Sequence, residues 1–367
     1  MFKKYPILKW TLFVLTGLII VVVSFGWWFM NLLPSTNADV SASKVSDISY
    51  LSENIQPIRG KILAVVTSAD TMGASGKATG YELTELARAY YVFQANGFEV
   101  DVASPLGGEP AVIIDDEDMG IYDYAFLNDS IAQKKTTNTI PMEKIVAEDY
   151  EAVFFAGGKG AMFDFPENKY IQSIVRDLYQ TDKVIGAVCH GPAALVNVVL
   201  DNGRSLIENK EVSGFTNKEE LLLIPEAKTV FPFLLEDKLL AQGALFNEGA
   251  MYLEQISHDK NLVTGQNPWS TWKMAETMVA QMGHTPKYRE ITAEENAVNV
   301  LDVYEKHGYQ KAKDQIDHMY RVEHKPIDRI LIAKHSIMAA MQGDLGRFFA
   351  IVGLTSKAKS AAKEHQS

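Results

Sequence analysis

Residues 184–192 read Val-Ile-Gly-Ala-Val-Cys-His-Gly-Pro. Five small or apolar residues, typical of a strand buried on both faces, run directly into a cysteine and a histidine. Because Gly191 and Pro192 then open a helical stretch, we predict a sharp strand-to-helix turn that carries Cys189, the only cysteine of the chain. A thiol at a helix N-terminus is expected to have a lowered pKa, whereas the alternative is a buried structural cysteine.

Strands and helices alternate on both sides of this turn. We predict strands over 62–66, 98–103, 150–156, 212–215 and 261–264, with a further one ending at Cys189, and helices over 80–96, 169–180, 193–200 and 270–282. Buried strands separated by helices indicate a parallel sheet covered on both faces, an α/β fold. Ligands of such sheets bind beyond the carboxyl ends of the strands, where Cys189 and the pair Gly157-Gly158 both fall.

The N-terminus predicts a membrane anchor. Residues 10–30 carry no charge and are long enough to cross a bilayer as a helix. Lysines at 3, 4 and 9 precede this run, and the charges after it nearly cancel, so the N-terminus is expected in the cytoplasm and the remainder outside it, periplasmic or extracellular. A cleaved signal peptide is the alternative, but residues 34–38 match a cleavage site poorly.

Composition limits the partners. The net charge of −11 with 22% charged and 47% hydrophobic residues is typical of a globular protein. The acidic excess lies in the middle of the chain and there is no basic stripe, so no nucleic-acid partner is expected. The acidic run 115–118 lacks the spaced ligands of a calcium loop and is interpreted as a solvated loop. We expect no metal and no cofactor.

The residues after about 285 form a different segment. Thr292 to Glu295 is a capping-box pattern, Gly308 can end that helix, and Pro326 starts a second helix with an apolar face, followed by a shorter apolar piece over 348–354. None of these runs could span a membrane. We predict a small helical extension that packs on the body or on a second subunit, in a homo-oligomer. The predicted parts are a cytoplasmic stub and anchor (1–33), a tether (34–57), the α/β domain (58–284) and the helical extension (285–367).

Three stretches together resemble the PfpI superfamily, which includes the Parkinson-disease-associated deglycase. They are 187–192 (Ala-Val-Cys-His-Gly-Pro), 155–166 (Phe-Ala-Gly-Gly-Lys-Gly-Ala-Met-Phe-Asp-Phe-Pro) and 96–101 (Asn-Gly-Phe-Glu-Val-Asp). The resemblance covers about 58–283 and is closest to the branch of heat-shock chaperones and glutathione-independent glyoxalase III proteins. It implies a class I glutamine amidotransferase-like fold, a flavodoxin-like parallel sheet between helices.

The resemblance also implies roles for residues around the cysteine. Cys189 would be the nucleophile and His190 its neighbour in a triad-like arrangement, with the backbone N–H groups of Gly158 and His190 forming an oxyanion site. Because adjacent side chains usually point apart, we expect His190 to contribute its backbone more than its ring. The family commonly has histidine where this chain has Lys159, which puts the substrate in doubt.

Two carboxylates complete the implied site. The glutamate of the first helix, at a fixed distance before the glycine that ends it, corresponds to Glu85, with Glu82 nearby as a decoy. A carboxylic acid beside a thiol can share its proton and later move protons on a substrate. A downstream acid that orients the histidine corresponds to Glu220, with Glu219 as the close alternative.

The sequence therefore predicts a membrane-anchored, extracytoplasmic cysteine enzyme acting on a small reactive carbonyl, glyoxalase III-like or deglycase-like. One alternative is an amidase or peptidase that uses Cys189, His190 and Glu220. Another is a non-enzymatic chaperone or redox-sensing module, with the helical extension as its binding surface. Glutamine amidotransferases of this fold pair the cysteine with a His-x-Glu pattern late in the chain. Glutaminase activity is not expected here, because no histidine is followed two residues later by glutamate.

Overall fold

The computed structural model describes residues 6–34, 39–115 and 118–366. Some residues named in the sequence analysis lie outside these ranges. They are lysines 3 and 4, residues 35–38 of the possible signal-peptide cleavage site, and residues 116–117 of the acidic run. The chain forms two compact units, Asp39–Glu290 and a second unit that joins Met1–Ala38 to Ile291–Ser367. The candidate site residues named above all belong to the first unit.

A seven-stranded sheet forms the centre of the first unit, with strand order β10-β11-β7-β6-β1-β3-β5. Every neighbouring pair is parallel except the hairpin of β10 and β11. The predicted flavodoxin-like α/β fold is confirmed. The strands are β1 (Gly60–Val65), β3 (Phe98–Ser104), β5 (Ile140–Pro141), β6 (Ala152–Phe155), β7 (Val184–Val188), β10 (Ile256–Asp259) and β11 (Leu262–Gly265).

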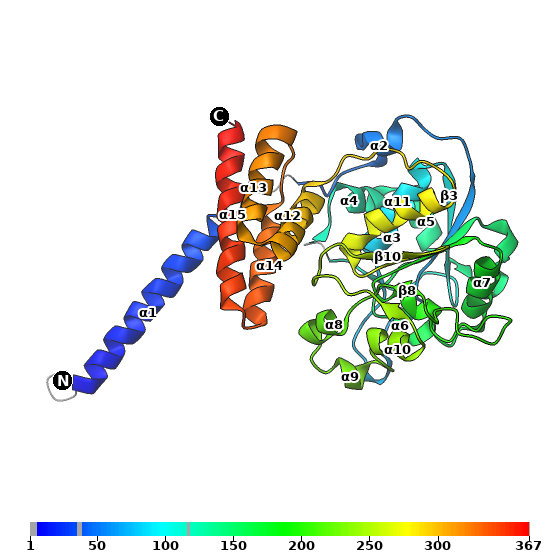
Figure 1. Ribbon diagram of the computed structural model, residues 1–367, viewed down its shortest axis with the longest axis horizontal. Coiled ribbons are helices and arrows are strands. Elements are labelled where there is room, and N and C mark those ends of the chain that lie inside the picture. Colours follow the sequence, from blue (N-terminus) through cyan, green and yellow to red (C-terminus); the bar gives the residue numbers. More distant parts are fainter. Residues whose placement is uncertain (1–5, 35–38, 116–117, 367) are drawn as a thin grey trace. The chain divides into compact units, whose positions relative to one another are not determined.

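Helices cover the sheet on both faces, which is why the inner strands β6, β7 and β11 are mostly apolar and are buried throughout. Figure 1 shows α3, α4 and α11 on one side of strand β10 and α6, α8 and α10 on the other. The helices of this unit are α2 (Ser49–Ser52), α3 (Leu83–Ala95), α4 (Ile121–Asn128), α5 (Ser130–Thr136), α6 (Ala161–Asp164), α7 (Lys169–Gln180), α8 (Asn217–Leu223), α9 (Ala227–Val230), α10 (Leu235–Ala241) and α11 (Thr271–Gln281).

Three predicted elements differ in the structure. The helix predicted over 193–200 is wrong: only the short 3₁₀ helix η7 (Gly191–Leu195) forms, and Asn197 has a φ of +63° that a helix cannot contain. The helix predicted from residue 80 starts at Leu83, because β2 (Tyr81–Glu82) pairs with β4 (Val112–Ile113). The strand predicted over 212–215 shrinks to β8 (Glu211–Val212), which pairs with β9 (Leu245–Phe246) in a separate small sheet.

The regular elements of the second unit are all helices within its described residues. It contains α1 (Pro6–Met30), α12 (Ala293–His307), α13 (Tyr309–His318), the π-helix η9 (Met319–Glu323), α14 (Arg329–Met341) and α15 (Leu345–Gln366). Thr292 and Glu295 form the predicted capping box of α12. Sequence reasoning missed α13 and made α15 too short, because the second half of α15 packs through small residues such as Ala358 and Ala361, which leave no apolar pattern.

Helix α1 stands apart from the other helices in composition. Its window Phe13–Met30 has a mean hydropathy of 2.2 and is not buried within the protein. Among the described residues it is the helix whose length and composition suit a membrane span, features that a signal sequence near the N-terminus shares.

Candidate active site

Cys189 lies at the predicted strand-end turn. β6 and β7 are parallel neighbours with Phe155 opposite Ala187, so the residues after both strands meet at one edge of the sheet. Cys189 has a φ of +59°, an unusual conformation for a residue with a side chain. Two backbone hydrogen bonds hold it there: its N–H donates to the Gly265 carbonyl at 2.9 Å, and its carbonyl accepts from the Phe215 N–H at 2.8 Å.

His190 turns its ring toward the sulfur. The Cys189 Sγ lies 3.3 Å from His190 Nδ1, and His190 Nε2 lies 2.6 Å from Glu220 Oε2. The expectation that His190 contributes its backbone more than its ring is therefore wrong as far as geometry goes. The chain changes from positive φ at Cys189 to helical angles at His190, which removes the alternation that sends adjacent side chains to opposite sides.

Cys189, His190 and Glu220 form a connected chain of acid–base groups in the interior of the domain. Cys189, His190 and Glu220 expose 5%, 2% and 5% of their surface. If His190 Nε2 carries the proton donated to Glu220, Nδ1 is free to accept the thiol proton. The ring of His190 also packs between those of Phe215 and Phe231, at 4.6 and 6.2 Å between centroids. This packing fixes the orientation that a general base needs.

Glu85 approaches the cysteine from the first turn of α3. Its Oε2 accepts a hydrogen bond of 2.6 Å from the Gly157 N–H, whereas its Oε1 is buried without a hydrogen-bond partner. Burial, with the nearby Glu82 charge, raises the pKa of Glu85 well above its ordinary value. The raised pKa favours the protonated form of Glu85, and the buried Oε1 is an oxygen that can carry the proton. Glu85 also interacts with the Cys189 thiol. Burial also raises the pKa of Glu82, to about 7.

The thiol differs from the sequence prediction. Burial raises the pKa of Cys189, and Glu85 adds to this, so the lowered pKa predicted from a helix N-terminus is not what the structure gives. Burial outweighs any lowering by η7, the helix after the turn, which has only five residues. In this environment the resting sulfur is a thiol, and the nearby His190 ring is the base that can take its proton.

The structure separates Glu219 from Glu220. Glu219 closes the capping box of α8 by accepting hydrogen bonds from the Thr216 N–H and hydroxyl at 3.0 and 2.9 Å. Its other oxygen accepts from Tyr252 N, Gln266 Nε2 and Asn267 Nδ2. Glu219 therefore holds loops together, while the next residue is left to orient His190. The sequence pattern Thr216-x-x-Glu219 carried this signal.

Gly157 and Gly158 let the backbone after β6 lie close to the Glu85 carboxyl group and to Cys189. A Cβ atom on Gly157 would lie 2.6 Å from Glu85 Oε2 and 2.8 Å from the Cβ of Cys189, so only glycine fits. Gly158 has a φ of +96°. Within the described ranges, the backbone N–H groups of Gly158 and His190 donate to no protein acceptor. Both donors are thus available to an oxyanion.

Two further residues act on the site: Tyr252, which sequence reasoning missed, and Lys159, which it noted as a departure from the family. The Tyr252 hydroxyl is buried without a hydrogen-bond partner, and the charges of Glu219, Cys189 and Glu220 act on it. Its ring meets Phe215 edge-to-face at 5.9 Å. Lys159 is half-buried, its ammonium makes no hydrogen bond or ion pair with the described residues, and its charge acts on Cys189 and Glu82. Tyr252 lies in an irregular loop far along the chain, so no motif pointed to it.

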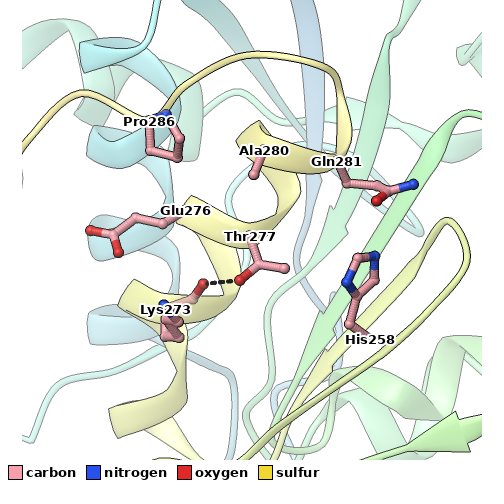
Figure 2. Close-up of a pocket in the computed structure, with 7 residues that line it drawn as sticks. All are labelled: His258, Lys273, Glu276, Thr277, Ala280, Gln281 and Pro286. Atoms are coloured by element: carbon pink, nitrogen blue, oxygen red, sulfur yellow. Dashed lines mark hydrogen bonds between the residues drawn. The ribbon is translucent and has the colours of Figure 1, made fainter.

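A surface hollow of about 310 Å³ lies elsewhere, on the outer side of α11. Figure 2 shows its lining from α11, with His258 of β10 and Pro286 of the following loop, and a hydrogen bond of 2.7 Å from Thr277 Oγ1 to the Lys273 carbonyl. None of the residues around Cys189 lines it. It is therefore separate from the candidate active site.

A buried cysteine at a strand-end turn of a flavodoxin-like sheet, with a histidine and a glutamate on either side, defines a class of cysteine-centred α/β proteins. The DJ-1/PfpI family matches residues 77–281, and the chain belongs to this family. The matched range contains every candidate site residue.

Several relatives lie in one branch. The chain is 31% identical over 234 residues to Glyoxalase 3 of Candida albicans, covering 60% of this chain and 96% of that protein. It is 32% identical over 228 residues to Glutathione-independent glyoxalase HSP31 of Saccharomyces cerevisiae, covering 58% and 94%.

Solved structures agree with this placement. Rapid Encystment Protein 24 kDa of Francisella tularensis matches with a TM-score of 0.58 and 36% identity over 61% of this chain and 99% of that one. Glyoxalase III from Candida albicans matches with a TM-score of 0.55 and 28% identity over 60% and 97%.

Proposed function

We propose that this protein is a cysteine-dependent enzyme that converts small 2-oxoaldehydes into 2-hydroxy acids without glutathione. The observation that carries the proposal is the buried Cys189 thiol placed between a protonated Glu85 and the His190–Glu220 pair. Relatives named glutathione-independent glyoxalase support it. This arrangement supplies a nucleophile, a base and a separate proton carrier, which a conversion between adjacent carbons requires.

The first step forms a carbon–sulfur bond. His190 Nδ1 takes the thiol proton, and Glu220 stabilises the resulting imidazolium. The sulfur attacks the aldehyde carbon and breaks its C=O π bond. The N–H groups of Gly158 and His190 stabilise the developing oxyanion. Glu85 then gives this oxygen its proton, which leaves a hemithioacetal and an ionised Glu85.

The second step moves a proton between carbons. Ionised Glu85 removes the hydrogen from the former aldehyde carbon to form an enediolate, and returns a proton to the neighbouring carbon. The hydroxyl proton shifts to the second oxygen, so that a thioester remains on Cys189. Tyr252, as an unpartnered donor, and Lys159, as a cation, are the side chains available to the negative second oxygen.

Hydrolysis returns the site to its starting state. Glu85 takes a proton from the attacking water, the thioester C–S bond breaks, and the imidazolium of His190 gives its proton to the departing sulfur. The hydroxy acid leaves, with Glu85 protonated and Cys189 a thiol again. Protons and electrons balance without any added reactant other than water.

The test uses the full chain purified in detergent with its thiol reduced. We expect it to convert methylglyoxal into lactate with no glutathione present, and Cys189→Ala to abolish this. Ser360→Ala, an exposed change in the helical unit, is the matched control and should leave turnover intact. Absence of turnover of methylglyoxal, glyoxal and phenylglyoxal by the reduced wild type would refute the proposal.

A hydrolase acting on amides or esters is the second candidate, favoured by the complete chain from Sγ through the imidazole to Glu220. The two functions differ in their need for Glu85. Amide hydrolysis that persists in Glu85→Gln but not in Cys189→Ala would favour the hydrolase.

We also propose that α1 anchors the protein as a single pass, with the N-terminus in the cytoplasm and the α/β unit outside it. The exposed apolar window and the lysines at 3, 4 and 9 support this orientation. Alkaline carbonate should leave the protein in the membrane fraction, and protease added to intact spheroplasts should degrade the α/β unit. Release by carbonate would refute the anchor, and protection from protease would refute the orientation.

A further inference from the structure

The connection between α14 and α15 carries an unusual set of exposed apolar side chains. The tip of this hairpin, residues 337–349, exposes Ile337 by 50%, Met341 by 60%, Leu345 by 62% and Phe349 by 60%. Ile337 and Met341 are one helical turn apart, as are Leu345 and Phe349, so each helix presents an apolar edge. Figure 1 shows α14 and α15 side by side and joined at one end.

The charges of the tip are already engaged. It contains only two charged residues, Asp344 and Arg347. Asp344 accepts a hydrogen bond of 2.9 Å from the Arg347 N–H and so caps the start of α15. The Arg347 guanidinium lies 2.8 Å from a carboxylate oxygen of Glu305. Within residues 337–349, the exposed apolar side chains of the tip therefore have no unpaired charged group beside them that would favour contact with water.

The tip contacts the candidate span at a definite depth. Phe25 of α1 packs on Phe348 and Phe349, with ring centroids 6.0 and 6.4 Å apart. Phe25 lies five residues inside the end of the apolar window at Met30. At a rise of ~1.5 Å per residue this places the contact about 7 Å below the outer end of the apolar window.

Two polar contacts fix the direction of the hairpin. The Lys359 ammonium donates to the Asn31 carbonyl, and Arg329 Nη1 donates to the Leu32 carbonyl at 3.0 Å. These polar contacts lie just past the end of the apolar window, further along α15 than Phe349. Helix α15 therefore rises out of the membrane level together with the end of α1, and its first turn is the deep end.

We infer that the α14–α15 tip inserts into the outer interfacial layer of the bilayer in which α1 is anchored. The inference rests on the proposed anchor. Interfacial elements bury their apolar residues about 5–10 Å below the headgroups, which matches the depth set by Phe25. The occupant of the exposed edge is lipid, because a residue that packs on the span at that depth faces headgroups and acyl chains. The helical unit is thus held to the membrane at two places.

Single-cysteine variants test this in the full chain. In a Cys189→Ser background, Val21→Cys reports on the span, Met341→Cys and Phe349→Cys report on the tip, and Ser360→Cys is the exposed control on α15. Each is labelled with the environment-sensitive fluorophore NBD and reconstituted into vesicles of phosphatidylcholine and phosphatidylglycerol. The vesicles carry lipid with a doxyl quencher either near the headgroup or near the chain end.

We expect blue-shifted emission at 21, 341 and 349 and water-like emission at 360. Quenching at 341 and 349 should be stronger with the headgroup-proximal doxyl lipid. Water-like emission at 341 and 349 with lipid-like emission at 21 would overturn the tip insertion and leave the anchor standing. Blue-shifted tip probes that neither doxyl lipid quenches would show that protein covers the tip, and would overturn it too. Water-like emission at 21 would overturn the anchor, and the inference with it.

Discussion

Glu85→Gln should lower the activity of the protein without lowering its stability. Glutamine keeps the size of Glu85 and an oxygen that can accept the 2.6 Å hydrogen bond from the Gly157 N–H, but it cannot take or give a proton. General acid–base catalysis contributes about 10²–10⁴-fold to a rate. We therefore expect kcat for methylglyoxal to fall by about 10²–10⁴-fold, or about 3–5 kcal/mol of barrier. Cys189, His190 and Glu220 keep their contacts, so alkylation of the thiol should persist.

The same substitution should make the protein more stable at neutral pH. The pKa of Glu85 is raised by burial, so the folded state holds this proton at pH values where the unfolded chain has lost it. Stability from this group is complete below the ordinary glutamate pKa, and falls as pH rises toward the raised folded pKa. The loss approaches about 1.36 kcal/mol per pH unit. Glutamine removes this slope.

The assay is urea unfolding of wild type and Glu85→Gln in detergent between about pH 5 and pH 8, with lactate production measured in parallel. The difference between the two proteins matters, because other buried carboxyls such as Asp164, whose pKa is raised to about 6, contribute equally to both. A gain in stability that grows with pH, together with a large fall in kcat, is the expected result. A variant with nearly wild-type kcat would refute the proton-carrier role, and an unchanged pH slope would refute the protonated state.

Four further substitutions test individual contacts. Gly157→Ala places a Cβ 2.6 Å from Glu85 Oε2, and should lower the unfolding free energy by about 1–3 kcal/mol and reduce turnover; wild-type stability in urea would contradict the close approach. Glu220→Gln should lower kcat about 10²-fold with little change in Tm. Glu219→Gln should instead lower the unfolding free energy by about 1–3 kcal/mol, seen as a lower Tm, with little change in kcat. The reverse pattern in paired kinetic and melting measurements would exchange their roles. Tyr252→Phe should lower kcat/KM about tenfold without loss of Tm, because its hydroxyl has no partner to lose; unchanged kcat/KM would remove Tyr252 from the substrate site.

Local patterns in the sequence were enough to place Cys189 at a strand end. The apolar run into Cys189 and the alternation of strands and helices predicted the sheet and the edge where Gly157 and Cys189 meet. The choice of Glu220 rested on the family resemblance, which left Glu219 as a close alternative. The spacing Thr216-x-x-Glu219 is the sequence signal that could have separated them, because it places Glu219 at the helix start.

The orientation of His190 could not be predicted, because it depends on the sign of one backbone angle at Cys189. The thiol environment was misjudged for a related reason: its burial and the approach of Glu85 are set by tertiary packing. Tyr252 reaches the site from a loop with no periodic pattern. In the helical unit, small residues on α15 bury surface without the large apolar side chains that sequence reasoning detects.

The positive φ of Cys189 has a consequence for what selection must maintain in this chain. A residue with a side chain held in the left-handed region costs of order 1–2 kcal/mol, and glycine adopts the same conformation without that strain. Cysteine at this position is thus a worse choice for folding than glycine. Replacement of this cysteine by glycine would relieve the backbone strain, so a copy of this protein that no longer needed the thiol would gain by losing the cysteine at this position.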